Sequence, residues 1–365
     1  MLNETLADTF EATVHNLPEP ALERDYFFHD VRVTCQADHP AMLAILDEML
    51  GIFPEPEKQL GEFKYIVLCY ESVAHFPVQL PASRKRTATV RLLTDTRLKY
   101  YVDRTSRTEY QSYEALPPVN GTVLTAISRS QNVVLTQLES PGQYQATFLR
   151  RYVFLLALGQ FMSRFGFEPC HAAAITAPWD NEQGALIIGA SGSGKTTLSL
   201  GCANIGCGFL GDDLMMLRKT AVEGIISAYA ITHEISVRSS SLHLWDSLDF
   251  LRSYPVDIRD KRYCSIEEVF SGTSRMHTPV RLLLFPSLTN ETQSVVTRMS
   301  KASTLQRLVD ECMSTVNSNP QAQAKTFLFL SQLAEQAPGY QIAIALRAND
   351  GPQIVRSLFT GELND

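Results

Sequence analysis

Several features of disulfide-rich and zinc-binding proteins are missing from this chain. It has seven cysteines, which is an odd number, and no two of them form a CxxC pair. They are scattered at positions 35, 69, 170, 202, 207, 264 and 312. This distribution argues against a disulfide framework and against a structural zinc site. The cysteines therefore indicate a reducing compartment such as the cytoplasm.

The sequence also lacks a long apolar run and an excess of positive charge. Its most apolar window, residues 152–167, contains Gln160, Ser163 and Arg164 and falls short of the ~20 apolar residues that a membrane span needs. The first residues show neither the basic nor the apolar stretch of a signal peptide. The formal net charge is −7, whereas nucleic-acid-binding domains usually carry a basic excess. We therefore expect a cytoplasmic protein with no membrane or nucleic-acid partner.

What the sequence does contain is enough apolar residues for a large folded core. Hydrophobic residues make up 45% of the 365 residues and charged residues 19%, an ordinary balance for a globular protein. The length exceeds the roughly 250–300 residues at which single cores stop growing. We therefore expect two domains, with a boundary at 145/146.

The first domain, residues 1–145, has the pattern of a smaller α+β domain. Apolar residues recur at i, i+3, i+4 and i+7 across residues 41–50, which predicts an amphipathic helix. Short β-like runs occupy residues 31–35, 65–69, 87–93, 98–102, 123–127 and 132–138. Its position before the second domain suggests a role in substrate recognition.

The second domain, residues 146–365, has an α/β pattern. It follows the start of a predicted helix over residues 144–165, and strands over 171–176 and 185–188 come next, joined by a polar hairpin loop. Towards the C-terminus, the patterns predict strands over 279–285 and 340–346 and helices over 302–312 and 321–337.

A glycine-rich segment directly after the strand over 185–188 matches GxxxxGK[ST] at every fixed position. It reads Gly189, Ala190, Ser191, Gly192, Ser193, Gly194, Lys195 and Thr196. Glycines let backbone N–H groups surround phosphate oxygens, the lysine reaches the β- and γ-phosphates, and the threonine hydroxyl can bind Mg²⁺. A helix starting at Thr197 directs its positive end at the same anion. The alternative, a glycine-rich turn that only packs closely, leaves the lysine and threonine unexplained.

A pair of carboxylates, Asp212 and Asp213, follows a short predicted strand over residues 207–210. The first lies 17 residues after Lys195. Carboxylates at a strand end next to a phosphate loop indicate Mg²⁺ binding, because hard oxygen ligands suit this ion. By itself such a pair is more often a solvated turn.

The stretch from His171 through the phosphate loop to the Gly-Asp-Asp element resembles the catalytic domain of HPr kinase/phosphorylase and the HPr-kinase-like serine kinases. These proteins share a fold with phosphoenolpyruvate carboxykinase, which implies a C-terminal P-loop kinase domain with a mixed sheet. The resemblance implies that Asp212 is the catalytic base, that His171 tunes its charge and that Lys195 acts on the phosphates. It also implies that Asp213 and Thr196 hold Mg²⁺. A structural histidine at a strand start is the alternative for His171.

The family's glutamate–isoleucine–arginine–glycine signature has only an approximate counterpart here, in residues 233–238. Glu234 is a candidate Mg²⁺ ligand and Arg238 a candidate phosphate contact, although a surface strand with two charges explains them equally well. The segment 259–262, with Lys261, is expected to be a solvated loop, with guidance of an acidic substrate as the alternative. The two tryptophans, Trp179 and Trp245, are too few to suggest an aromatic binding box.

These observations favour an ATP- and Mg²⁺-dependent kinase that phosphorylates a Ser or Thr hydroxyl of a protein or peptide. The chain resembles the divergent HPr-kinase-like proteins more than the bifunctional enzymes, and some of these divergent proteins resemble modifiers of ribosomally made peptides. Two alternatives remain: a non-catalytic ATP-binding regulatory module, and a small-molecule kinase of carboxykinase-like fold. Relatives of HPr kinase are commonly oligomeric, so a homo-oligomer is also left open.

Overall fold

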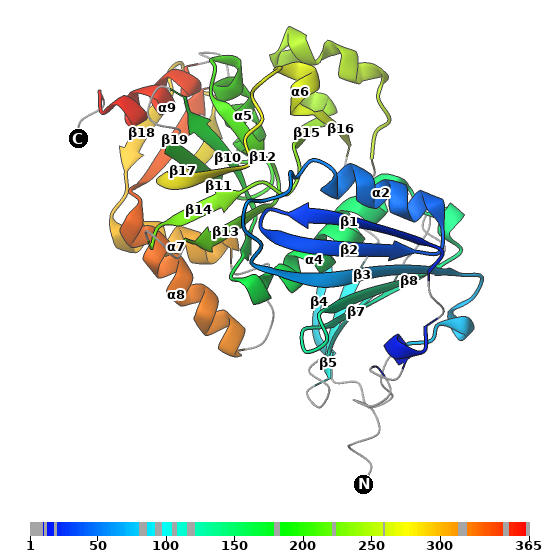
Figure 1. The fold of residues 1–365 in the computed structure, drawn as a ribbon. Coiled ribbons are helices and arrows are strands. Elements are labelled where there is room, and N and C mark those ends of the chain that lie inside the picture. Colours follow the sequence, from blue (N-terminus) through cyan, green and yellow to red (C-terminus); the bar gives the residue numbers. More distant parts are fainter. Residues whose placement is uncertain are drawn as a thin grey trace. The chain divides into compact units, whose positions relative to one another are not determined.

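A computed structural model describes residues 10, 13–17, 20–79, 86–91, 97–103, 108–114, 121–178, 183–220, 224–257, 260–312, 320–345 and 350–362. Trp179 lies outside these ranges, as do residue 259 of the segment 259–262 and parts of the predicted strand over 87–93. The chain divides into two compact units, residues 1–165 and 166–365 (Figure 1).

The N-terminal unit contains an eight-stranded sheet with the order β1-β2-β3-β8-β7-β6-β5-β4 in the part of the chain that is described. Strand β3 is parallel to both of its neighbours, β2 and β8. All other neighbouring pairs in this sheet are antiparallel. The strands are β1 Leu22–Phe28, β2 Val31–Ala37, β3 Gly61–Tyr70, β4 Arg86–Arg91, β5 Arg97–Asp103, β6 Thr108–Glu114, β7 Thr122–Ser128 and β8 Val133–Glu139. The sequence patterns predicted β2, β3, β4, β5, β7 and β8 but neither β1 nor β6.

Helix α2, Pro40–Leu50, confirms the helix predicted from apolar spacing. Its first turn is fixed by Pro40 and by His39, whose side chain accepts a hydrogen bond from the Ala41 N–H. The apolar face that defined the pattern, including Met42 and Leu46, is buried. The short 3₁₀ helix η1, Val73–His75, is the other helical element before β8 among the described residues after residue 20.

The helical segment predicted over residues 144–165 belongs to the N-terminal unit, so the boundary predicted at 145/146 lies twenty residues too early. The segment consists of η2 Pro141–Gln143, α3 Ala146–Phe148, the π-helical turn η3 Leu149–Phe154, α4 Leu155–Met162 and η4 Ser163–Phe165. Helix α4 packs on strands β7 and β8, and the Phe161 ring stacks on Phe63 with 4.3 Å between centroids. The chain leaves this unit at Gly166, whose φ of +83° favours glycine.

The C-terminal unit has a nine-stranded mixed sheet within the described ranges. Its main path is β12-β10-β11-β17-β14-β13-β9, and β19 pairs with both β17 and β18. The strands are β9 Glu168–Cys170, β10 Ala172–Ala177, β11 Gln183–Ile188, β12 Gly208–Gly211, β13 Met215–Lys219, β14 Ile226–Tyr229, β17 His277–Thr289, β18 Val295–Arg298 and β19 Gly339–Ala345. The antiparallel pairing of β10 with β11 confirms the predicted hairpin.

Helices cover both faces of this sheet (Figure 1). One face packs against α5 Lys195–Asn204 and α9 Gly351–Thr360, and the other against α7 Lys301–Cys312 and α8 Pro320–Gln336. Strand β11 contributes side chains to both faces. Leu186 and Ile188 pack in the cluster with α7 and α8, and Ala185 and Ile187 pack in the cluster with α5 and α9. Alternation along a strand that is covered on both sides explains its continuous apolar sequence.

A separate two-stranded sheet pairs β15 Glu234–Arg238 with β16 Lys261–Ser265 in antiparallel fashion. The helical turns η5 Ser239–Leu244 and η6 Asp246–Ser253 and helix α6 Ile266–Val269 accompany it. Ile235 and Val237 face a buried cluster with Leu200 of α5. The other face of β15 is therefore left to polar side chains.

The mixed α/β architecture agrees with the fold class that the sequence predicts. Among the described helices, none is both long and apolar enough to span a bilayer.

The packing of α4 on the N-terminal sheet makes a stability prediction. Phe161 is fully buried, so Phe161→Ala should lower the free energy of unfolding of the N-terminal unit by about 3–5 kcal/mol. Chemical denaturation monitored in the full chain measures this change. The neighbouring exposed Arg164 provides a control, since Arg164→Ala should change the stability by less than about 0.5 kcal/mol. Equal stabilities of the two variants would contradict this assignment of the helix.

Candidate functional site

The phosphate-loop sequence lies between a buried strand and a helix, as the motif requires. Strand β11 ends at Ile188, residues 189–194 form the loop, and α5 begins at Lys195. Gly192 and Gly194 have φ values of +87° and +102°, which side chains disfavour. A Cβ atom on Gly194 would also lie 2.7 Å from Leu288 Cδ2. The loop therefore needs glycine at both positions to keep its shape.

Lys195 folds back over its own loop. Its Nζ atom donates hydrogen bonds to the Gly189 carbonyl oxygen at 2.5 Å and to the Ala190 carbonyl oxygen at 3.2 Å. The side chain is buried, and burial lowers the pKa of this ammonium group, although Asp212 and Asp213 oppose the shift. A phosphate group on the loop could replace these carbonyl contacts with a stronger, charged partner.

His171 connects Lys195 to the acidic turn. Its Nδ1 atom lies 2.5 Å from the Asp213 carbonyl oxygen, and its Nε2 atom lies 3.3 Å from Lys195 Nζ. A carbonyl can only accept, so Nδ1 carries the proton and Nε2 accepts from the lysine. Burial and the positive charge of Lys195 lower the pKa of His171. A neutral imidazole is the form that satisfies both contacts.

Asp212 is buried behind the phosphate loop. Its Oδ2 atom accepts a hydrogen bond from Thr196 Oγ1 at 2.8 Å, and its Oδ1 atom accepts from the Asp213 N–H at 3.0 Å. Ser236 Oγ lies 3.1 Å from the same Oδ2. Burial, followed by the negative charge of Asp213, raises the pKa of Asp212. These contacts join the loop and the acidic turn directly.

Asp213 lines the pocket. Its backbone conformation is uncommon for residues other than glycine. Its φ of +73° is in the left-handed region, and its carbonyl meets His171. Its Oδ2 atom forms an ion pair with Lys261 Nζ at 2.8 Å. Ser236 Oγ lies 3.0 Å from this Oδ2 and 3.1 Å from Lys261 Nζ.

Lys261 is a site residue that sequence reasoning missed. The segment was expected to be a solvated loop, but Lys261 is buried on strand β16, opposite Arg238 of β15. Directly paired residues of an antiparallel sheet project to the same face. The face that carries Ser236 and Arg238 therefore carries Lys261 too. The alternation of polar and apolar residues over 234–238 indicates a strand, but it does not identify 261–265 as its partner.

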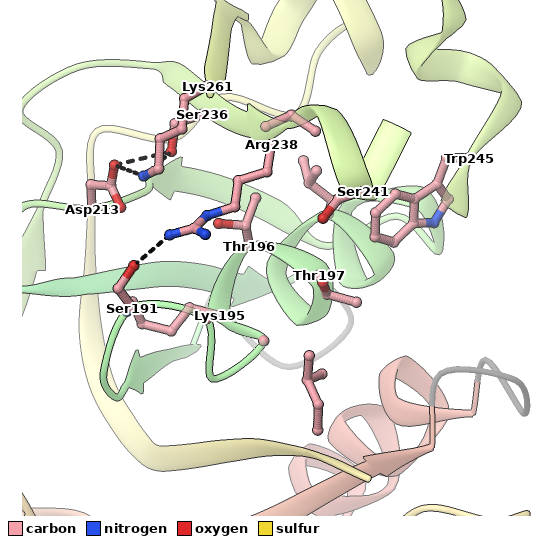
Figure 2. A pocket seen from close by; sticks show the side chains of 15 residues that line it. Ser191, Lys195, Thr196, Thr197, Asp213, Ser236, Arg238, Ser241, Trp245 and Lys261 are labelled. Carbon is pink, nitrogen blue, oxygen red and sulfur yellow. Dashed lines mark hydrogen bonds and ion pairs between the residues drawn. The ribbon is translucent and has the colours of Figure 1, made fainter. Parts of the chain in front are cut away.

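Arg238 and Glu234 end up in different surroundings although they share one face of β15. Arg238 Nη2 donates a hydrogen bond to Ser191 Oγ at 3.0 Å, which brings its guanidinium onto the phosphate loop (Figure 2). Glu234, predicted as a Mg²⁺ ligand, is not among the described residues that line the pocket. The structure therefore brings Arg238 to the site and leaves Glu234 outside its lining.

The pocket over the loop holds about 630 Å³ of empty space, its open mouth included. Its lining combines loop and helix residues with β15, β16 and the η5–η6 segment: Ser191, Gly192, Gly194, Lys195, Thr196, Thr197, Leu200, Asp213, Ser236, Val237, Arg238, Ser241, Trp245, Lys261 and Leu288. Among these residues, three cationic side chains face one carboxylate. A locally positive site within an acidic chain suits a polyanionic ligand.

The oxygen donors next to the loop can be compared with the ligands that Mg²⁺ prefers. The Thr196 hydroxyl and an Asp212 carboxylate oxygen are 2.8 Å apart, and both are hard ligands. The Asp213 carboxylate, expected to bind the metal with Thr196, is instead paired with Lys261. No cluster of three or more His, Cys, Asp or Glu side chains suited to a metal occurs among the described residues. The donors fit an ion that takes its remaining ligands from phosphate oxygens and water.

Comparisons with known proteins show distant structural similarity alone. No protein-family model matches the chain, and no curated protein matches it. The solved structure of the Hpr(Ser) kinase/phosphatase from Coxiella burnetii aligns with 53% of this chain and 90% of its own, at 12% sequence identity and a TM-score of 0.31. At this level the similarity says nothing about activity, which has to be argued from the site.

The contacts of Lys195 predict its role in anion binding. Lys195→Met keeps the apolar stem and removes the charge, so the affinity for ATP and for inorganic tripolyphosphate should fall about 30-fold or more, equivalent to ~2 kcal/mol. Isothermal titration calorimetry measures both. Lys219→Met, at an exposed lysine of β13, is the matched control and should leave both affinities unchanged. Wild-type affinities in Lys195→Met would refute phosphate binding by this loop.

Proposed function

We propose that this protein is an ATP-dependent kinase that transfers the γ-phosphate to a Ser or Thr hydroxyl of a protein or peptide. One observation carries the proposal: the hydroxyl of Thr196, the last residue of the phosphate-loop motif, donates a hydrogen bond to the buried carboxylate of Asp212. Phosphoryl transfer requires positioned charge around the phosphates and a base near the acceptor hydroxyl. This contact places a carboxylate directly against the loop.

The phosphate-binding part of the proposed site consists of the loop N–H groups and three cations. The N-terminus of α5 points its backbone N–H groups at the position of the phosphates. Lys195, Arg238 and Lys261 surround the same space from three different elements. Negative charge that develops on the transferred phosphoryl group would be stabilised by these side chains.

In the proposed reaction, Asp212 is the base. Its carboxylate accepts the proton of the acceptor hydroxyl, the hydroxyl oxygen bonds to the γ-phosphorus, and the bond from that phosphorus to the β-phosphate oxygen breaks to release ADP. The raised pKa of Asp212 supports this role, because a base works best when its pKa approaches the ambient pH. Its present contact with Thr196 has to give way to the acceptor hydroxyl.

Mg²⁺ is part of the proposal as the usual partner of ATP. When bound, it supplies positive charge that neutralises phosphate oxygens. Thr196 would hold it together with a carboxylate of the acidic pair. Asp212, the closer partner of Thr196, is assigned the role of base, and Asp213, now paired with Lys261, is the proposed metal ligand beside Thr196. Glu234, the other metal ligand suggested by the sequence, is not among the described residues that line the pocket.

The nature of the acceptor rests on the resemblance of residues 171–217 to HPr-kinase-like serine kinases. We propose that the N-terminal unit recognises the peptide or protein substrate. A homo-oligomeric assembly and a cytoplasmic location are part of the same proposal.

One observation favours a second candidate, a non-catalytic ATP-binding regulatory module. Asp212 is 1% exposed, and both carboxylates are already engaged, one by Thr196 and the other by Lys261. Such a site could bind nucleotide without presenting a base. Nucleotide binding without phosphoryl transfer would identify this case.

Substitution of the acidic pair tests the base. Asp212→Asn keeps the shape of the side chain and removes its basicity, so kcat for transfer from γ-labelled ATP to a Ser/Thr peptide library should fall about 10²–10⁴-fold. The Kd for ATP should change by no more than about threefold. Wild-type turnover by Asp212→Asn would show that Asp212 is not the base.

Asp213→Asn is the matched control for this experiment. If Asp212 is the base, Asp213→Asn should retain more activity than Asp212→Asn and should shift the Mg²⁺ concentration that gives half-maximal rate. A lower activity in Asp213→Asn than in Asp212→Asn would show that Asp213, and not Asp212, is the base. Chelation of Mg²⁺ should abolish transfer in the wild-type protein.

A further inference from the structure

The pocket over the phosphate loop has two chemically different ends. Asp213, Ser236 and Lys261 gather at one end, and Trp245 lies at the other end beside Ser241 (Figure 2). In the proposed function no residue at the end that contains Trp245 is assigned to the phosphates, yet Trp245 and Ser241 line the same pocket.

Trp245 is held in place from behind. It is an extended residue between the helical turns η5 and η6, with φ −144° and ψ 126°. Its half-buried indole packs against a buried cluster that includes Leu242, Leu248 and Leu251, while it also lines the pocket. A large ring supported by core residues presents a flat surface at little cost in conformational entropy.

Apolar side chains from two further elements line the same pocket, Leu200 of α5 and Leu288 of β17. Thr197 of α5 also lines it, on the side of Ser241 and Trp245 (Figure 2). Leu288 flanks the loop at Gly194, and 44% of its surface is exposed. The lining therefore has Lys261 and Asp213 at one end and the Trp245 ring at the other (Figure 2).

We propose that Trp245 stacks on the nucleobase of the bound nucleoside triphosphate and that this end of the pocket is the base subsite. The inference rests on the proposed function for the nucleotide itself. A nucleoside triphosphate has a polyanionic end and a flat aromatic end, which match the two ends of the pocket. One tryptophan is sufficient, because stacking needs a single ring.

Ligands with and without a base separate this subsite from phosphate binding. Stacking of a base on an aromatic side chain contributes about 1–3 kcal/mol, so Trp245→Ala should weaken ATP binding by about tenfold. The affinity for inorganic tripolyphosphate, which has no base, should remain within about twofold of wild type. Trp245→Phe should recover most of the ATP affinity. Isothermal titration calorimetry on the full chain measures all of these values.

Tryptophan fluorescence provides an independent readout, because the chain has only two tryptophans. In a Trp179→Phe variant, ATP should quench the fluorescence of Trp245, and tripolyphosphate should leave it nearly unchanged. Retained tripolyphosphate binding also shows that Trp245→Ala has kept the loop intact.

Three results would overturn the inference. Unchanged ATP affinity in Trp245→Ala would remove the base subsite alone and leave the phosphate loop in place. An equal loss for ATP and tripolyphosphate would show that Trp245 only supports the fold of the pocket. A wild-type protein that binds neither ligand would overturn the proposed function together with this subsite.

Discussion

The hydrogen bond from Thr196 to Asp212 is the contact on which the candidate site depends. It joins the first turn of helix α5 to the acidic turn that follows strand β12. A second connection runs parallel to it, because His171 bridges Lys195 and the carbonyl of Asp213. The left-handed backbone of Asp213 makes this bridge possible by turning its carbonyl towards the histidine. The loop lysine, the histidine and both carboxylates are therefore held in one hydrogen-bonded unit.

The same network explains how an acidic protein can present a site for an anion. The net charge is −7, but three of the side chains that line the pocket are cationic. Each of the three already has a partner: Lys195 on loop carbonyls, Arg238 on Ser191 and Lys261 on Asp213. Binding of a phosphate chain would exchange these contacts for stronger ones instead of bringing unpaired charges together. This arrangement keeps buried charges compensated throughout.

The sequence predicted the parts of the site that depend on short-range spacing. The motif fixes the spacing of its glycines, Lys195 and Thr196. This spacing predicts a loop between a strand and a helix, and the structure has that arrangement. Lys261 could not be placed in this way, because it reaches Asp213 only after two strands pair across a connection of more than twenty residues. Trp245 was passed over for a similar reason: its neighbours along the chain do not reveal that helix α5 lies beside it. The domain boundary was misplaced because apolar spacing in residues 144–165 predicts a buried helix without indicating which sheet covers it.

A crystal structure of the full chain with Mg²⁺ and a non-hydrolysable ATP analogue would test the central claim most directly. We expect the phosphates on the N–H groups of residues 189–194, with Lys195 Nζ moved from the Gly189 carbonyl to a phosphate oxygen. The γ-phosphate should then face the side of the pocket formed by Asp213 and Lys261, with Asp212 behind it. An analogue bound elsewhere, with the contact between Lys195 and Gly189 intact, would contradict the account.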